Sequence, residues 1–157
     1  MKGTAVSRSM PVSGERVFAL LHNYDRRLEW DTLLCEARLT DGHKEAGKGV
    51  TSVCVGKAFF GKVAMATRYV SYEPGKIAAV ELVNRPWFFD RFAASIRHKD
   101  TPGGSEITYK LRFAARPRLL AWLLEPIMLR YLKHKTGKRL DALANFLRSE
   151  VRDESLG

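Results

Sequence analysis

The hydrophobic periodicity of the chain changes to two near Leu33 and returns to about 3.6 after Arg116-Pro117, and this second change limits the folds open to it. Before that point, several segments alternate apolar and polar residues, as the strands of a half-buried sheet do. After it the period is close to 3.6, and a helix about 37 Å long is expected from Pro126 to about Glu150. The inward stripe of this helix comprises Leu129, Leu132, Thr136, Leu140, Leu143 and Leu147. Because such a stripe must be buried against the preceding strands, we predict an α+β fold.

Turn signals divide the alternating part into strands. Asp41-Gly42, Glu73-Pro74-Gly75-Lys76 and the segment from Asp100 to Gly104 are rich in residues that favour turns. The expected strands span residues 4–12, 34–40, 49–55, 62–73, 77–83, 87–99 and 106–114. Because short turns join consecutive strands, the sheet should be antiparallel, with about six to seven strands.

Helical patterns lie at both ends of the chain. Ser13 is typical of an N-cap, and two short helices are expected, one after Ser13 and one from Asp25 to about Thr32. A further short helix is expected from Leu119 to Leu124, because Pro126 suits the first turn of a new helix better than a helix interior. The pattern predicts a single domain over residues 1–151 and a polar tail over residues 152–157.

The chain is strongly basic. Its 157 residues include 27 Lys and Arg against 17 Asp and Glu, and the net charge is +10. The window from Lys110 to Arg139 holds nine basic residues and one acid, Glu125, so it alone carries +8. This imbalance favours acidic partners, namely nucleic acid, anionic lipid, or phosphorylated and carboxylated ligands. A hydrophobic fraction of 45% with 28% charged residues excludes the collagen-like, disordered and disulfide-scaffold classes.

The cysteines and the N-terminal residues bear on the cellular compartment. Cys35 and Cys54 form no C-x-x-C pair and are expected as reduced thiols. No apolar region follows Lys2, and no run reaches the ~18 apolar residues of a membrane span. A cytoplasmic location is therefore expected.

The sequence has no clear motif for metal or cofactor chemistry. The four histidines form no H-E-x-x-H pair, and neither G-x-S-x-G nor G-x-G-x-x-G occurs. The stretch from Gly42 to Lys48 approaches a phosphate-binding loop, but Gly49 stands where Ser or Thr is needed, and no helix follows. No cofactor and no metal site are therefore predicted.

Several local patterns resemble one known superfamily. They are Ser9-Met10-Pro11-Val12, Trp30-Asp31, Gly47-Lys48-Gly49, Tyr72-Glu73-Pro74-Gly75-Lys76, and Gly103-Gly104-Ser105-Glu106-Ile107-Thr108-Tyr109. Together with the basic C-terminal helix, they make the chain similar to the START-like, or SRPBCC, superfamily, and within it to the polyketide cyclase/dehydrase and lipid-transport branch. The resemblance implies a helix-grip fold, in which a curved sheet wraps a long helix and leaves an elongated apolar cavity. It also implies binding of a lipid, quinone, hormone or polyketide, either by an enzyme or by a carrier.

An internal cavity makes inward-facing aromatic, apolar and hydroxyl residues candidates for ligand contact. Pockets for small ligands are mostly apolar, with a few placed polar groups. The candidates are Met65, Thr67, Tyr69, Phe88, Phe92, Tyr109, Phe113, Trp122, Leu129 and Thr136. The alternative interpretation of each residue is ordinary core packing.

Three residues are candidates for proton transfer if the protein is an enzyme. His98 has a reference pKa near neutrality, Tyr109 carries a hydroxyl, and Asp90 shares a predicted strand face with His98. An inward Asp90 would need a partner such as Arg85 or Arg91. The alternatives are a bulge that turns Asp90 to solvent and a strand-end His98 close to water. No strong acid–base pair is predicted.

The basic residues of the long helix allow two interpretations. They are Arg130, Lys133, Lys135, Lys138 and Arg139. Either they form the solvated back of an amphipathic helix, or they bind an anionic membrane or RNA. The neighbouring segment from Leu119 to Met128 is a candidate for touching a bilayer, capping the cavity mouth or making a dimer contact. A monomer or a weak dimer is expected.

The favoured function is the binding, and by extension the transport, of a small hydrophobic or amphipathic ligand in an internal cavity. A polyketide cyclase or dehydratase is the first alternative. A basic interaction module for an anionic membrane, a ribosome or RNA is the second.

Overall fold

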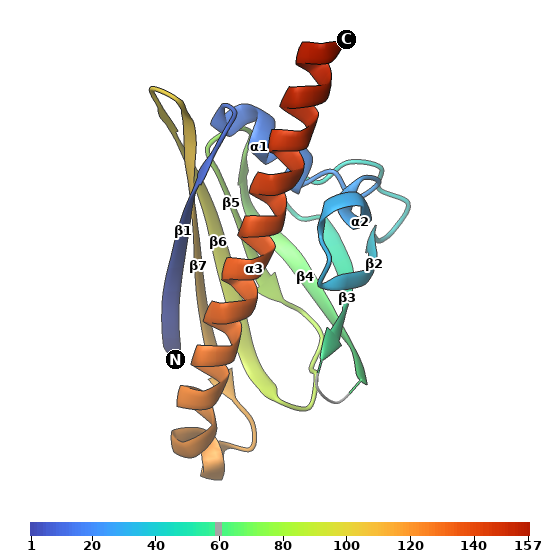
Figure 1. The fold of residues 1–157 in the computed structure, drawn as a ribbon. Coiled ribbons are helices and arrows are strands. Elements are labelled where there is room, and N and C mark those ends of the chain that lie inside the picture. Colours follow the sequence, from blue (N-terminus) through green and yellow to red (C-terminus); the bar gives the residue numbers. More distant parts are fainter. Residues whose placement is uncertain (59–60) are drawn as a thin grey trace.

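A seven-stranded antiparallel sheet wraps around one long helix in the computed structural model, which describes residues 1–58 and 61–157 (Figure 1). The strands are β1 (Lys2–Met10), β2 (Leu34–Leu39), β3 (Thr51–Ala58), β4 (Gly61–Glu73), β5 (Ile77–Leu82), β6 (Phe89–Thr101) and β7 (Gly104–Ala115). The helices are α1 (Gly14–Leu21), α2 (Arg27–Trp30) and α3 (Ala121–Leu156), with a 3-10 turn, η1 (Arg118–Leu120), before α3. The predicted α+β helix-grip fold, with two short helices after the first strand, is confirmed.

The strand order brings the first strand beside the last. The order is β1-β7-β6-β5-β4-β3-β2, and β1 joins the meander by pairing with β7, for example at Val6 and Tyr109. Register shifts interrupt β4 near Tyr69 and β6 between Phe89 and Arg91. Such bulges bend a strand and increase its twist, so they help the sheet to curve around α3.

The C-terminal helix is longer and less interrupted than the sequence predicts. Residues 118–120 form the 3-10 turn, and α3 then runs without a break from Ala121 to Leu156, about 54 Å. The predicted break before Pro126 is wrong, because this proline lies inside α3. Pro126 removes one N–H donor to the carbonyl of Trp122, but both residues are exposed, so water can hydrogen-bond to that carbonyl. Within residues 1–58 and 61–157, no helix has the length and hydrophobicity to span a bilayer.

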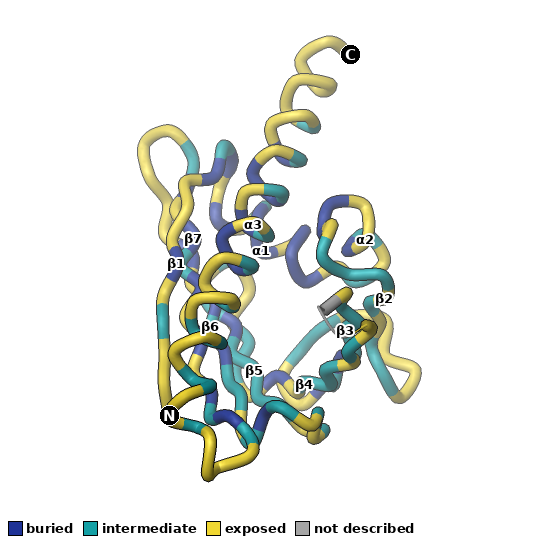
Figure 2. The backbone as a smooth tube through the Cα atoms, turned by 60° about the horizontal axis from the view of Figure 1, so that its bottom comes forward, coloured by how far each residue is buried: buried dark blue, intermediate teal, exposed yellow. Residues whose placement is uncertain are grey.

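Ion pairs connect the last turns of α3 to the short helices. Arg16 of α1 pairs with Glu154, and Arg26, which precedes α2, pairs with Glu150. These side chains are partly exposed, so each pair contributes at most about 1 kcal/mol. Residues 152–156, expected as part of a polar tail, are exposed and helical, and Figure 2 shows these turns extending beyond the sheet.

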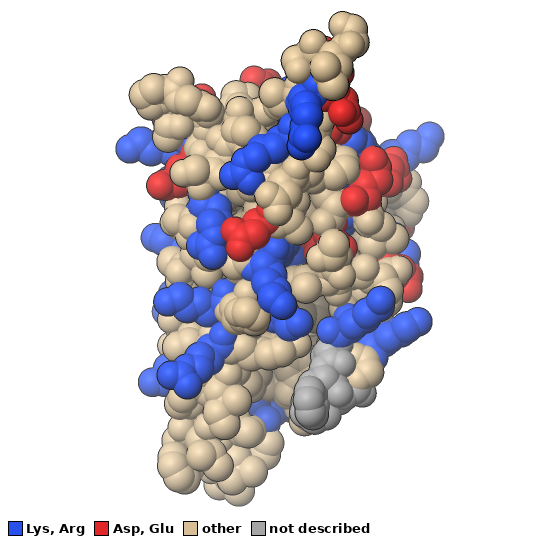
Figure 3. Space-filling model, viewed as in Figure 1, with Lys and Arg blue, Asp and Glu red and all other residues tan. Residues whose placement is uncertain are grey.

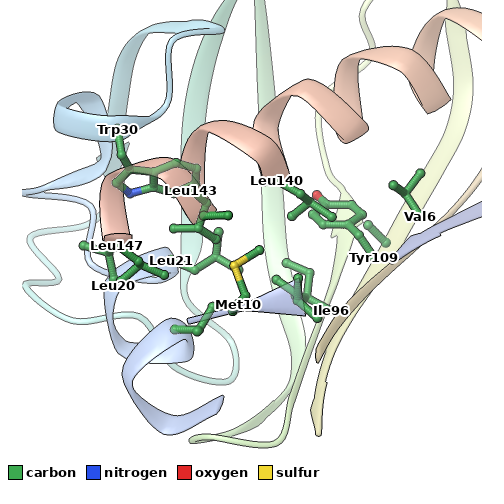
Figure 4. Close-up of a cluster of buried hydrophobic side chains, with 14 of the residues drawn as sticks. Val6, Met10, Leu20, Leu21, Trp30, Ile96, Tyr109, Leu140, Leu143 and Leu147 are labelled. Carbon is green, nitrogen blue, oxygen red and sulfur yellow. The ribbon is translucent and has the colours of Figure 1, made fainter. Parts of the chain in front are cut away.

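The hydrophobic core occupies one half of the space between α3 and the sheet. Leu140, Leu143 and Leu147 of α3 are fully buried and pack with residues of β1, β6, β7 and α1 (Figure 4). Before Thr136, by contrast, the described part of α3 contains no buried residue. The first half of the helix therefore packs less closely against the sheet, and this leaves room for a cavity.

Candidate ligand-binding cavity

A cavity of about 540 Å³ lies between the sheet and the first half of α3. Its volume falls within the usual range for small-ligand pockets, about 300–1,000 Å³. Strands β2 to β7 contribute residues to one side, and α3 contributes residues such as Leu124, Met128 and Leu132 to the other. Most of the side chains around the cavity are apolar.

The period-two pattern of β4 builds one wall of the cavity. Val63, Met65, Thr67 and Tyr69 alternate along this strand, and all four line the cavity. Successive side chains of a strand point to opposite faces of the sheet, so the intervening residues face outward. The sequence pattern therefore correctly predicts the inward face of this strand.

The structure brings part of the predicted ligand-contact set to the cavity. The predicted residues that line it are Met65, Thr67, Tyr69, Phe88, Phe92 and Tyr109. They come from β4, β6, β7 and the segment just before β6. Their side chains lie on the side of the sheet that faces the cavity.

The other four predicted contacts lie elsewhere. Phe113 is fully buried and packs against Phe89, with 5.8 Å between the ring centres, so it belongs to the core. Thr136 is buried where α3 meets the sheet, and Leu129 packs against the same core. Trp122 has 75% of its surface exposed. None of these four residues lines the cavity, and their assignment to its wall is corrected. For Leu129 and Thr136 the reason is that the inward face of α3 meets core along one part and cavity along another.

A chain of hydrogen bonds forms the polar end of the cavity, near α1 and α2. The Tyr69 hydroxyl lies 2.8 Å from His22 Nδ1 and 2.8 Å from the Tyr24 hydroxyl, and all three side chains line the cavity. Burial, assisted by the charges of Arg27 and His98, lowers the pKa of His22 to about 3. Burial also raises the pKa of Tyr69 well above its usual value. His22 is therefore neutral at pH 7, and its Nε2 has no hydrogen-bond partner among the described residues.

Two arginines share one buried carboxylate beside this chain. Arg27 Nε donates a hydrogen bond to Asp31 Oδ2 over 2.9 Å, and Arg139 Nε lies 3.0 Å from the same oxygen. Arg27 also donates to the Leu21 carbonyl over 3.1 Å and lies 5.0 Å from the Trp30 ring centre. Both arginines line the cavity, whereas Asp31 does not. This group of three charges therefore carries a net charge of about +1 toward the cavity.

All charged groups found on the cavity wall have the same sign. Besides Arg27 and Arg139, the wall includes Lys57, Arg116 and Lys135. Across residues 1–58 and 61–157, no Asp or Glu lines the cavity. Cations attract an anion more strongly in apolar surroundings than in water, because the effective dielectric constant is lower. The arrangement is suited to a ligand with an acidic group and an apolar body.

The sequence does not predict the polar end of the cavity. Two partial signals are present, since Arg27 and Asp31 stand at helical ion-pair spacing and Trp30-Asp31 contributes to the family resemblance. No local pattern indicates that Arg139, from the far end of the chain, pairs with Asp31. His22 follows α1 directly, and it reaches Tyr69 because α1 packs against the sheet.

Asp90 does not line the cavity. It lies at the bulge in β6 and pairs with Arg116 at 3.6 Å and Arg118 at 3.0 Å, not with Arg85 or Arg91. The hydrogen bond from Arg118 lowers the pKa of Asp90, which favours the ionised form. The interpretation of Asp90 as an inward proton-transfer group is therefore wrong, and the alternative of a bulge is confirmed.

His98 is buried beneath α1 rather than close to water at a strand end. Its side chain is 7% exposed, and its ring centre lies 5.5 Å from that of Phe18. Neither ring nitrogen has a hydrogen-bond partner among the described residues, and burial lowers the pKa of His98 to about 4. Because His98 does not line the cavity, Tyr109 is the one predicted proton-transfer residue that does.

Comparison with known proteins agrees with the fold. Residues 1–148 match the model of the family described as polyketide cyclase / dehydrase and lipid transport. The chain belongs to this family. The resemblance to START-like proteins is thereby confirmed, and the family supports a ligand-binding helix-grip domain for small hydrophobic ligands. No curated protein matches the chain.

Solved structures share the fold of this cyclase and lipid-transport family member at low sequence identity. TTHA0849 from Thermus thermophilus is 14% identical, with a TM-score of 0.79 over 95% of this chain and 99% of that one. MLL2253 from Mesorhizobium loti is 16% identical, with a TM-score of 0.71 over 94% and 98% of the two chains. The di-domain ARO/CYC StfQ from the steffimycin biosynthetic pathway is 11% identical, with a TM-score of 0.78 over 95% of this chain and 51% of that one. At these identities the likeness establishes the fold alone.

Proposed function

We propose that the protein binds a small amphipathic ligand, with an apolar body and an acidic group, in the cavity between the sheet and α3. One observation carries this proposal: the described lining residues are mostly apolar, and their charged members are all basic. Since Arg27 and Arg139 share only the Asp31 carboxylate, a neutral hydrocarbon would leave one of these two positive charges without a counter-charge, whereas an acidic ligand would supply one.

Arg27 and Arg139 are the residues that we assign to the acidic group. They share the carboxylate of Asp31, so one positive charge is left for a ligand. A guanidinium can bind a carboxylate or a phosphate through two parallel N–H donors, and such charge-assisted bonds are roughly twice as strong as neutral ones. The hydroxyls of Tyr24 and Tyr69 stand beside the arginines as further hydrogen-bonding groups.

The apolar body of the ligand would pack against residues such as Met65, Val80, Phe92 and Tyr109. Each Å² of apolar surface removed from water stabilises the complex by about 25 cal/mol, before the loss of ligand freedom is subtracted. A ligand that also exchanges with a membrane or a partner would make the protein a carrier.

The proposal is tested by finding the ligand and then by varying its charge. Native mass spectrometry with solvent extraction should detect an acidic amphiphile bound to the purified protein. Delipidated protein is then titrated calorimetrically with hexadecanoate and with hexadecan-1-ol. We expect the acid to bind at least about tenfold more tightly, which corresponds to about 1.4 kcal/mol.

A pair of arginine variants locates the charge effect. Arg139→Met should remove the preference for the acid, and Asp31 would stay paired with Arg27. Arg130→Met, on the exposed face of the same helix, should leave the preference unchanged. Equal affinity of the wild type for acid and alcohol would contradict the assignment of an acidic group, and a protein that binds no amphiphile would contradict the cavity function.

A second candidate function, catalysis of the cyclase or dehydratase type, is favoured by the hydrogen-bonded chain of His22, Tyr69 and Tyr24 on the cavity wall. Positioned proton-transfer groups typically accelerate a reaction 10²–10⁴-fold, as a rough range. With the extracted ligand or its precursor as substrate, Tyr69→Phe should then lower turnover by about 100-fold or more, with little change in affinity. A variant that changes affinity alone supports the binding function.

A further inference from the structure

Large apolar side chains are exposed together where α3 begins. Leu119, Leu120, Trp122, Leu123 and Ile127, here called the apolar tip, have exposed fractions of 89%, 47%, 75%, 49% and 62%. They belong to η1 and the first two turns of α3, at the lower end of the molecule in Figure 1. Single exposed apolar residues are common, but contiguous patches on a monomer mark a surface for a partner or a membrane.

The outward face of α3 changes from apolar to basic directly beyond the tip. Arg130, Lys133 and Lys138 are exposed on it, about 5, 9 and 17 Å along the helix from Ile127. Figure 3 shows Lys and Arg above the tip, while the Asp and Glu that it displays among the described residues lie farther up this face. An apolar end with a basic collar is the pattern of a segment that lies at a membrane interface.

We propose that the apolar tip inserts into an anionic lipid bilayer while Arg130 and Lys133 contact its head groups. The polar head-group layer of one leaflet is about 5–8 Å thick, which matches the rise from Ile127 to these two residues. Trp122 is a residue type that favours this interface, because its ring is apolar and its N–H can remain hydrated.

The same observations speak against other occupants. Two copies of the chain joined tip to tip would bring their basic collars together, and like charges repel. RNA would be attracted by the collar, and Trp122 could stack on one base, but the other four residues of the tip are aliphatic and offer it neither hydrogen bonds nor stacking surfaces. The cavity adds a further argument, because Ile127 belongs to the tip and also lines the cavity, so the bilayer would meet the cavity wall directly.

The test uses the full chain and vesicles of defined composition. We expect cosedimentation with phosphatidylcholine vesicles that contain about 30% phosphatidylserine, and binding to pure phosphatidylcholine weaker by at least about tenfold. Leu119→Ser combined with Trp122→Ser should weaken binding about tenfold or more, because both side chains lose their apolar contact with the lipid. Arg130→Gln with Lys133→Gln should weaken it roughly 25-fold, at about fivefold for each charge removed.

Matched controls separate these effects from general surface changes. Leu156→Ser alters an equally exposed leucine, 80% exposed, at the opposite end of α3, and should bind as the wild type does. Arg97→Gln with Lys99→Gln removes the same charge from the far end of β6, and should weaken binding less than the collar variant. All substituted positions are exposed, so the variants should melt cooperatively near the wild-type temperature.

Three results would overturn the proposal. The first is no binding to the anionic vesicles, and the second is binding that the tip variant leaves unchanged. The third is a dimer in sedimentation velocity that the tip variant converts to a monomer, in a protein that does not bind vesicles. This result would show that the tip contacts a second copy of the chain. Calorimetric titration of the same variants with hexadecanoate keeps the two proposals separate. The proposed ligand site places the acidic group at Arg27 and Arg139, at the other end of the cavity, so the tip and collar variants should still bind hexadecanoate.

Discussion

Two buried histidines predict that mild acid destabilises the fold. The pKa of His22 is lowered to about 3 and that of His98 to about 4, by burial in both cases, against 6.5 for an unperturbed side chain. Between pH 6.5 and these lowered pKa values, the unfolded chain binds more protons than the folded one. The contribution of the two histidines to stability is therefore fully present above pH 6.5 and is lost as the pH falls below it.

The magnitude follows from the linkage relation. Between pH 7 and pH 5 the folded protein keeps both rings neutral, while the unfolded chain protonates them. Each histidine then removes about 2 kcal/mol of unfolding free energy, and both together about 4 kcal/mol. For a chain of this length, that corresponds to a decrease in Tm of roughly 8–16 °C. Because carboxylates titrate mostly below pH 5, the window isolates the histidines.

Urea unfolding of delipidated protein at pH 7 and pH 5 checks this value. His98→Phe should reduce the loss by about half, because one of the two titrating groups is removed. It should also stabilise the protein at pH 7, since His98 has two ring nitrogens without partners and lies against the ring of Phe18. His134→Gln, at an exposed position, should keep the full loss. A loss below about 1 kcal/mol in the wild type, or an equal loss in His98→Phe, would refute the reasoning.

Two further predictions concern the arginine pair and the two halves of α3. Asp31→Asn should destabilise the fold by about 3–5 kcal/mol in urea unfolding, because Arg27 and Arg139 would then face each other without a counter-charge; a loss equal to that of an exposed Asp→Asn variant would contradict it. Leu143→Ala should remove about 2–5 kcal/mol, whereas Met128→Ala should remove about 1 kcal/mol or less without ligand, since Met128 already borders open space. Similar losses for the two variants would indicate that the cavity is closed in solution.

The fold is predictable because its signals are local. The alternation of Val63, Met65, Thr67 and Tyr69 requires only that a strand have two faces. The periodicity of α3 likewise identifies its inward face. It does not distinguish core from cavity, because that depends on the distance between helix and sheet at each turn. The pattern therefore assigns Thr136 to the wrong surroundings.

The charged end of the site depends on tertiary packing and cannot be predicted in the same way. The sequence pattern indicates only that Arg139 belongs to a basic helix surface. It faces inward because α2 carries Asp31 to the side of α3, and no spacing in the sequence reports that contact. Trp122 illustrates the opposite case, an apolar residue that the pattern places inside and the structure leaves exposed, together with Leu119, Leu120 and Leu123 around it.

The two proposals, taken together, define how a ligand would be oriented. Ile127 and Trp87 border the cavity and are more than half exposed, at 62% and 63%, so the mouth lies beside the apolar tip. Arg139 lies about 18 Å farther along α3 from Ile127, at the polar end. With the tip in a bilayer, an acidic amphiphile in the facing leaflet already has its head group away from the membrane core and its chain toward it. It could therefore move along the membrane normal into the cavity, acidic group first toward Arg27 and Arg139, without turning over. If the charged end of the cavity lay at its mouth, the ligand would have to turn over before it entered. The position of Arg27 and Arg139 far from the mouth is therefore the feature that allows direct uptake from a membrane.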